Sequence, residues 1–236
     1  HTKWGYVLWD EDATFNHYIN YTNIPNENPD AEPCYPEDIY LDPEGHIDLL
    51  NKLMENDEFM QYYNTRYMDL MNTAFQKENL LEILEGIENS IAPDMPQHIA
   101  RWGGSLWMWQ NNVQKIKDFI NDRIDYLPNG LNSCYDLTGP YEITLDVEPA
   151  YSGKIKFNSI PIENGDYPWT GMYHGGIDML MEAVQTNSFD HWEFENHFVP
   201  DPDLTNISVS LFQSDNITAV YSSNETTNIV INEINY

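Results

Sequence analysis

Positive charge is scarce in this chain. Its 236 residues include 10 Lys and Arg but 39 Asp and Glu, which gives a formal net charge of -29. A molecule with this charge repels the phosphates of nucleic acids and the headgroups of anionic membranes, so we expect neither as a partner. The acidic excess serves either solubility alone or the attraction of cations and basic proteins.

The shortage of basic residues is most pronounced in the last third of the chain. No Lys or Arg follows Lys156, whereas Asp and Glu continue almost to the end. Because these carboxylates have no basic residue among them, we expect this part to lack internal salt bridges. Counter-ions or divalent cations would then stabilise it.

Long apolar runs are also missing. No stretch approaches the roughly 18 apolar residues of a membrane span, and no signal-peptide pattern begins the chain. We therefore expect no transmembrane segment. His1 is not a natural start, so we expect that a preceding portion of the protein is missing from the sequence.

Cysteine is rare: Cys34 and Cys134 stand alone, without the CxxC spacing of a zinc site. In an exported protein they would form a structural disulfide between a loop near the start and the junction before the later part of the chain. In a reducing compartment they would remain buried free thiols. The residues alone leave both possibilities open.

Aromatic residues are abundant at 14%, and hydrophobic residues reach 41%, so the chain should fold despite its charge. Residues 4–9 read as a buried strand, and a Pro-rich irregular loop follows to about residue 43. The apolar period is then helical as far as Leu127. We expect helices over about 47–54, 59–74 and 80–91, and a fourth after Met95 that is interrupted at Gly103-Gly104 and ends before Pro128.

Beyond Cys134 the apolar period falls to two, as in a sheet with one buried face. Turn residues separate the candidate strands, which predicts a small antiparallel sandwich. The expected strands are 141–147, 154–158, 177–184, 189–195, 206–212 and 216–221. Residues 229–236, after a polar linker, look like the first strand of another domain.

Asp10 and Asp12 end the first predicted strand, within KWGYVLWDEDATFN. Residues two apart in a strand point the same way, so both carboxylates could face one ion. Hard oxygen ligands of this kind suit Mg²⁺ or Mn²⁺ bound to nucleotide phosphates. The spacing by itself is equally consistent with two acids that face solvent.

The same segment resembles the W-D-x-D-A-T-[FW]-G motif of the CotH spore-coat-protein kinase family. NIPNENPDAEPCYPEDI, LMENDEFMQYYNTRYMDLMNTAF and IAPDMPQHIARWGG resemble successive parts of that family's helical C-terminal lobe. LTGPYEITLDVEPAYSGKIKFNSI and PWTGMYHGGIDMLMEAV resemble a β-domain that follows this lobe in exported bacterial members, and IVINEINY resembles the start of a lamin-tail-like domain.

The resemblance implies an α+β multidomain protein. Residues 1–130 would be the C-terminal part of an atypical protein-kinase-like domain, 131–223 an antiparallel immunoglobulin-like β-sandwich, and 224–236 a linker and the first strand of a further domain. The complete protein would be secreted or displayed on a bacterial cell surface and would phosphorylate a protein substrate with ATP and Mg²⁺ or Mn²⁺.

By position in the motif, Asp10 is the implied metal ligand and Asp12 a second ligand or its neighbour. Asn16 stands where the family usually has Gly, which leaves the loop geometry open. The family's phosphate-contacting Lys and catalytic Asp belong to a nucleotide lobe that would precede His1. Phosphoryl transfer needs several such parts together, so we do not expect this chain to be active alone.

Two other classes of function remain open. One is a catalytically inactive adhesion or binding protein of the cell surface, and the other is an exported cargo or partner of a secretion or surface assembly. A nucleotide lobe without its Lys or catalytic Asp would favour either over the kinase.

Four further groups of residues have both a functional and a structural interpretation. Arg101 beside Trp102 could bind phosphate, although we favour an Arg paired with an acid while Trp102, Trp107 and Trp109 fill the core. His191 and His197 could hold a metal but are more consistent with surface histidines. An aromatic set could stack on sugars or simply fill the sandwich: Tyr167, Trp169, Tyr173 and Trp192. Acids from Glu27 to Asp48 could bind Ca²⁺, without EF-hand spacing.

Overall fold

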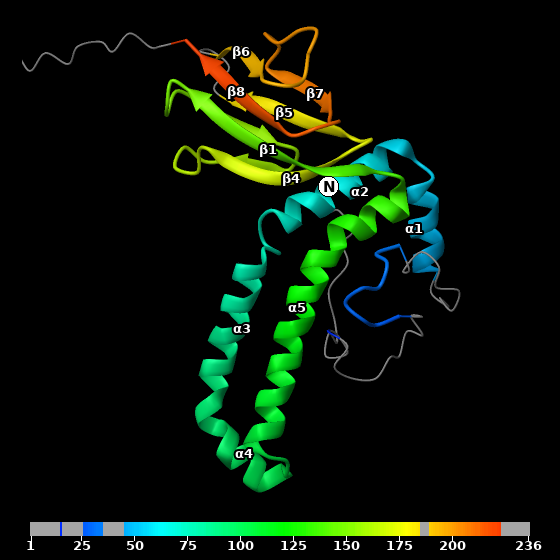
Figure 1. The fold of residues 1–236 in the computed structure, drawn as a ribbon, viewed down its shortest axis with the longest axis vertical. Coiled ribbons are helices and arrows are strands. Elements are labelled where there is room, and N and C mark those ends of the chain that lie inside the picture. Colours follow the sequence, from blue (N-terminus) through cyan, green and yellow to red (C-terminus); the bar gives the residue numbers. More distant parts are fainter. Residues whose placement is uncertain (1–14, 16–25, 35–44, 185–188, 223–236) are drawn as a thin grey trace, which may run out of the picture. The chain divides into compact units, whose positions relative to one another are not determined.

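The computed structural model describes residues 15, 26–34, 45–184 and 189–222. The chain divides into two compact units, His1–Leu137 and Thr138–Tyr236. The described part of the first is helical and that of the second is built from strands, so the protein is α+β (Figure 1). The division falls seven residues after the expected boundary at 130 because the last helix continues further than its sequence predicts.

The helical unit contains the expected helical segments, with the fourth split in two. Gly103 and Gly104 join the two pieces with φ angles of +85° and +95°, a backbone conformation that glycine adopts without strain. The elements are α1 (His46–Met54), α2 (Asp57–Met71), α3 (Lys77–Ile91), the short 3-10 helix η3 (Ala92–Asp94), α4 (Met95–Trp102) and α5 (Leu106–Tyr135). In the part of the chain that the structure describes, no helix has the length and apolarity needed to cross a membrane.

Polar caps fix where two of these helices begin. Asn56 precedes α2, and its side-chain oxygen accepts a hydrogen bond from the backbone N–H of Phe59 at 2.9 Å. Ser105 precedes α5 in the same way, with its hydroxyl oxygen 3.1 Å from the nitrogen of Met108. Each cap satisfies a backbone donor that has no partner within its helix.

The predicted end of the fourth helix at Pro128 is wrong. Helix α5 continues through Pro128, Asn129 and Gly130 to Tyr135. Proline lacks a backbone N–H and normally disrupts a helix interior. Here Leu127 and Leu131 on either side are 5% and 0% exposed, so burial of both side chains offsets the cost of the proline.

Helices α3 and α5 lie side by side, and α4 crosses one end of the pair (Figure 1). We call this arrangement of α3, α4 and α5 the helical hairpin. Neither α3 nor α4 contains a buried residue. Burial in this unit centres instead on α2 and α5, where Met68 is 1% exposed and the polar side chains of Asn64 and Asp69 are fully buried.

The β unit contains two four-stranded sheets (Figure 1). One has the order β4-β1-β8-β6 and the other β3-β2-β5-β7. The strands are β1 (Thr138–Glu148), β2 (Lys154–Phe157), β3 (Ile160–Ile162), β4 (Trp169–Gly175), β5 (Asp178–Val184), β6 (Phe189–Phe194), β7 (Asn206–Ser210) and β8 (Asp215–Tyr221). Neighbouring strands are antiparallel except β1 and β8, which run parallel.

The two sheets pack face to face around an apolar core. Phe157 from one sheet meets Tyr173 from the other with ring centroids 4.8 Å apart and planes at 84°, a favourable edge-to-face arrangement. Both side chains are fully buried, as are Leu145 and Ile155. The Tyr221 hydroxyl lies between the carbonyl oxygens of Lys154 and Val184, at 2.8 and 2.9 Å.

Two strands were not predicted from the sequence. β3 is only three residues long and contains Pro161, which normally argues against a strand; it is tolerated because β3 lies at the edge of its sheet. β4 contains Gly171 and Gly175, which weaken a strand signal. An added side chain at Gly175 would come within 2.2 Å of the Leu211 carbonyl oxygen, so the close approach requires glycine there.

Acids of the last third nevertheless find lysine partners just before it. Lys154 and Lys156, the last two bases of the chain, pair with Glu163 and with Glu182, the second pair at 3.3 Å. Antiparallel pairing of β2 with β3 and β5 brings these later acids back beside the lysines. Such exposed pairs contribute only about 0 to 1 kcal/mol each.

Candidate functional site in the helical unit

The predicted metal ligands Asp10 and Asp12 lie outside the described residues, as do residues 4–9 and 229–236. The described residue nearest to them in the sequence is Phe15. Its ring contacts Phe119 of α5 edge-on, with centroids 5.7 Å apart. The opening motif is therefore followed directly by a residue that rests on the middle of α5.

A second segment, residues 26–34, lies against the same helix and is fastened to it by Arg123. The guanidinium group donates hydrogen bonds from Nη1 to the carbonyl oxygens of Pro29, at 3.0 Å, and Ala31. Tyr67 of α2 also interacts with Arg123. Burial raises the pKa of the Tyr67 hydroxyl and outweighs the opposing effect of the guanidinium, so the phenol stays protonated at neutral pH.

The same segment is fastened to the end of α5 by a disulfide. Cys34 and Cys134 are bonded, with their Cα atoms 5.7 Å apart. The free-thiol alternative does not hold in this structure. Pro33 lies so close to Gly130 that an added side-chain carbon there would be 2.8 Å from the proline ring. Arg123, Gly130 and Cys134 thus hold one side of α5 against residues 26–34.

An acidic hollow lies between this segment and α5. It is lined by Asn28, Pro29, Asp30, Asp122, Asp125, Tyr126 and Asn129. Lys77 of α3 already neutralises Asp125 through a 2.6 Å ion pair. Carboxylate and amide oxygens are donors that suit Ca²⁺ or Mg²⁺. Among the described residues, however, the three carboxylates of the hollow do not converge within 4.8 Å of one another.

Sequence reasoning placed the possible Ca²⁺ ligands among Glu27–Asp48 and missed the acids of α5. Asp30 lies in that range, but Asp122 and Asp125 are more than ninety positions further along the chain. Their spacing of three on one helix was the available signal, because such residues share a helix face. What brings Asp30 to them is the attachment of residues 26–34 by Arg123 and the disulfide.

Within the described residues, one group of potential metal-binding side chains comes within 4.8 Å of one another: Glu32, Cys34 and Cys134. Both sulfur atoms belong to the disulfide, and a disulfide offers no thiolate. This group therefore does not fit a metal site.

Comparison with known protein families decides the family of this chain. The family model described as CotH kinase protein matches residues 1–127. This chain belongs to the CotH kinase protein family. Searches of the curated proteins and of the solved structures found no match. The match includes Asp10, Asp12, Phe15, Arg123 and the acidic hollow up to Leu127, whereas the β unit lies outside it.

Inside the CotH-matched part, the expectation for Arg101, Trp102 and Trp107 is wrong, whereas Trp109 is half-buried. Trp102 and Trp107 are 69% and 71% exposed and do not fill a core. Arg101 pairs with no acid among the described residues; its guanidinium lies over the Trp102 ring, 4.9 Å from the centroid. Apolar residues at helical spacing predicted burial, but Trp102 and Trp107 lie at the end of the hairpin, on α4 and the first turn of α5, where both remain exposed.

Outside the CotH-matched part, the two candidate histidines do not come together in a metal site. His191 is half-buried between Asp190 and Glu193, and the hydrogen bonds to these carboxylates raise its pKa. The side chain of His197 is only 2% exposed, which contradicts its expected surface position. Its Nδ1 lies 2.6 Å from Asp215, and its Nε2 accepts a hydrogen bond from the backbone N–H of Phe212. His197 is thus fully engaged inside the β unit.

The aromatic residues considered for sugar stacking belong mainly to the core. Tyr173 and Trp192 are 0% and 2% exposed. The Tyr167 hydroxyl accepts a hydrogen bond from the backbone N–H of Ile155 at 2.7 Å, and burial raises its pKa to about 12. Side chains buried in this way cannot form a stacking surface.

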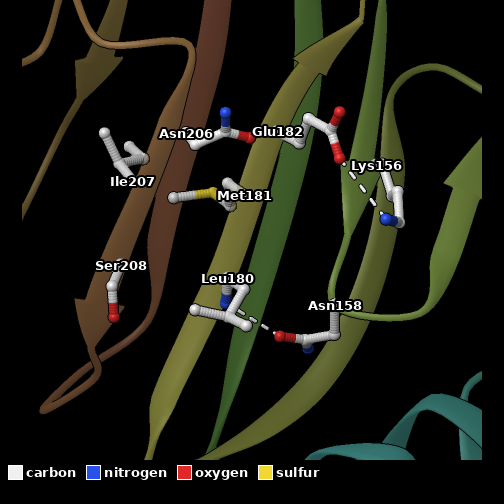
Figure 2. Close-up of a pocket in the computed structure, with 8 residues that line it drawn as sticks. All are labelled: Lys156, Asn158, Leu180, Met181, Glu182, Asn206, Ile207 and Ser208. Carbon is white, nitrogen blue, oxygen red and sulfur yellow. Dashed lines mark hydrogen bonds and ion pairs between the residues drawn. The ribbon is translucent and has the colours of Figure 1, made fainter.

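A hollow in the β unit lies over β2, β5 and β7 (Figure 2). Its lining includes the Lys156–Glu182 ion pair and Leu180, which is 55% exposed. The Asn158 side chain accepts a hydrogen bond from the backbone N–H of Leu180 at 2.8 Å, which ties β5 to the residue after β2. Of the other lining residues, Met181 and Ile207 are buried, and Asn206 and Ser208 are polar.

Proposed function

We propose that this chain is part of a secreted or cell-surface CotH-like protein kinase, which transfers phosphate from ATP to protein substrates with the help of Mg²⁺ or Mn²⁺. The observation that carries this proposal is the CotH kinase match over residues 1–127. The helical architecture of the described part of those residues is compatible with the helical lobe of a kinase-like fold.

In this proposal Asp10 binds the metal of the nucleotide site and Asp12 is a second ligand or its neighbour. Two carboxylates one residue apart are a donor set that suits Mg²⁺ and Mn²⁺. The bound metal would neutralise charge on the transferred phosphate. The contact between Phe15 and Phe119 supports the assignment, because it gives the chain just after the motif a rigid helix to rest on.

By the family resemblance, the nucleotide lobe, its phosphate-contacting Lys and the catalytic Asp come from sequence ahead of residue 1. The 236 residues would then supply one metal ligand and the helical support, and they would not transfer phosphate alone. The disulfide supports an oxidising location outside the cytoplasm, because structural disulfides persist in such compartments. The β unit would be an immunoglobulin-like module, and residues 224–236 would lead into a lamin-tail-like one.

Phosphate transfer from labelled ATP by the complete protein tests this function. With Mg²⁺ or Mn²⁺ present, we expect Asp10→Ala to reduce transfer by about 100-fold or more, since the variant loses a group that stabilises transition-state charge. Asp94→Ala is a matched control, because Asp94 is an exposed acid of η3 in the same unit. Equal transfer by wild type and Asp10→Ala would refute the metal assignment.

A second function from a different class is an inactive surface adhesion or binding protein, or an exported cargo or partner of a secretion or surface assembly. The exposed side chains around Leu180 favour it, because they offer a binding face on the β unit. If the complete wild-type protein transfers no phosphate but binds a partner, this function is favoured over the kinase.

A further inference from the structure

The end of the helical hairpin exposes large apolar side chains. Trp102 at the end of α4 and three residues at the start of α5 form what we call the hairpin tip: Trp102, Leu106, Trp107 and Met108. Their exposed fractions are 69%, 46%, 71% and 52%. Single exposed apolar residues are common on soluble proteins, but four within seven positions indicate an interaction surface.

The hairpin tip also differs from the rest of the molecule in charge. Although the chain carries a net charge of -29, no Asp or Glu occurs from Met95 to Lys117. Arg101 and Lys115 are exposed in this stretch, and neither forms an ion pair within the described residues. Locally, therefore, the tip is cationic, in contrast to the chain as a whole.

Distance separates the tip from most of the acidic residues of its own hairpin. Along α5 the first carboxylate after Leu106 is Asp118, about 18 Å away at 1.5 Å per residue. On α3 the nearest acid is Glu88, which already pairs with Lys117 at 2.7 Å. Since salt screens charges over about 8 Å at physiological ionic strength, the apolar side chains of the tip experience little repulsion from these acids, whereas Lys115 is three residues from Asp118 on α5. Asp94 is the one acid between Glu88 and Asp118.

We propose that the hairpin tip docks on an anionic lipid surface, with the tryptophan rings at the headgroup level and Arg101 and Lys115 facing the lipid phosphates. Trp prefers this interface because its ring is apolar and its N–H is polar. Basic side chains beside it add electrostatic attraction to anionic lipids. The helices do not span the bilayer; they rest on it by their end. The expected repulsion of anionic membranes then applies to the acidic remainder of the molecule and not to the tip.

A protein partner with an acidic groove, or a second copy of this chain, are the other possible occupants. The charge argues against a second copy meeting tip to tip, because Arg101 and Lys115 of both copies would face each other. A protein partner would need a groove that fits the tip. A fluid headgroup layer needs none, because lipids can rearrange around the aromatic and basic side chains.

Vesicle binding by the complete chain tests the proposal at low ionic strength. We expect sedimentation with vesicles of phosphatidylcholine mixed with phosphatidylglycerol, a blue shift of tryptophan emission, and quenching by brominated lipid. Binding should fall at least about tenfold in the double variant Trp102→Ser with Trp107→Ser. Arg101→Gln and Lys115→Gln should each weaken it about fivefold, and added salt should weaken it further.

Matched controls come from exposed side chains elsewhere. Tyr151→Ser and Leu180→Ser alter residues that are 74% and 55% exposed in the β unit, and we expect unchanged vesicle binding. No vesicle-dependent change in the wild type would overturn the proposal, as would equal binding by the double tryptophan variant. Equal binding to phosphatidylcholine alone would overturn the role of charge. Self-association that the tip variant abolishes, without vesicle binding, would assign the tip to a second copy instead.

Discussion

In the β unit, Phe157 and Tyr173 are fully buried between two sheets, whereas helices α3 and α4 of the helical unit bury no residue at all. The helical unit relies more on a few individual interactions: the disulfide, the hydrogen bonds of Arg123 and the contact of Pro33 with Gly130. A large shared core makes a unit cooperative, because each side chain contributes to the burial of many others. When a unit is held by a few separate interactions, as the helical unit is, its stability depends on a few residues.

The two units differ in which side chains are available for function. Residues of the β-unit core cannot change without disturbing both sheets, so its function is restricted to outward side chains such as those around Leu180. The helical unit leaves apolar and charged side chains exposed, and its CotH-matched residues include most of the acidic hollow and most of the hairpin. Exposed, weakly packed elements are the ones that partners and ligands can still order.

Removal of the disulfide is expected to have the largest effect, and it should be confined to the helical unit. In the chain-entropy model, a bond closing a loop of this length contributes about 4.5 kcal/mol. The variant Cys34→Ser with Cys134→Ser should therefore expose amides of α5 and residues 26–34 to hydrogen exchange, with little change in β1 or β8. Ser133→Ala, beside Cys134, is the control. Intact mass before and after reduction and alkylation checks that the bond exists; thiols that react without reductant would contradict it.

Phe157→Ala should have a nearly equal effect in the other unit. Replacing a buried aromatic ring by a methyl group costs about 3 to 5 kcal/mol, because it removes apolar contacts and leaves a cavity between the sheets. Hydrogen exchange followed by mass spectrometry should show faster exchange in strands of both sheets. Equal acceleration in α3 and α5 would contradict the independence of the two units.

A pair of Gly→Ala substitutions should change stability in opposite directions. Gly86 lies within α3 with no atom near enough to meet an added side chain, so Gly86→Ala should stabilise the helical unit by about 0.8 kcal/mol through helix propensity. At Gly130 the added carbon would come 2.8 Å from Pro33 and 2.9 Å from Tyr126. Gly130→Ala should therefore destabilise by about 1 kcal/mol, since overpacking exceeds the gain in propensity. Urea unfolding measures both; a stabilising Gly130→Ala would show that Pro33 can move away.

The smallest expected effect is a loss of β-unit stability at high pH. Burial raises the pKa of Tyr167 and Tyr221 from 10 to about 12. Because the unfolded chain loses these protons first, the stability that they provide is complete below pH 10 and declines as the pH rises towards 12. Tyr167 is half-buried, so solvent screening reduces its share of the effect, whereas Tyr221 is 2% exposed. Tyr167→Phe and Tyr221→Phe should reduce this alkaline dependence in thermal unfolding followed by circular dichroism; an unchanged dependence would assign it to other groups.

Much of the fold could be predicted from local pattern. The helical period over 47–124 and the alternating period over 141–147 and 216–221 correspond to helices and strands in the structure. Prediction failed where tertiary packing overrides local preference. Pro128 remains within α5 because Leu127 and Leu131 are buried around it, and Pro161 is accepted in β3 because that strand is at an edge.

The candidate site was less predictable. The opening motif and the family resemblance pointed to Asp10 and Asp12, which lie outside the described residues. The acidic hollow escaped prediction because Asp30 and Asp122 are distant in sequence, and the exposed tryptophans were assigned to a core because periodicity does not report what lies opposite a helix face.

Motifs, apolar periods and composition are local properties of a chain, so the family, the order of a helical part before a β part, and the excess of negative charge could be read from the residues. Which distant residues meet depends on the packing of whole elements. That packing joined Cys34 to Cys134, placed Asp30 and Asp122 around one hollow, enclosed His197 with Asp215, and left Trp102 and Trp107 exposed. These outcomes depend on how whole helices and sheets pack, which no short stretch of sequence specifies.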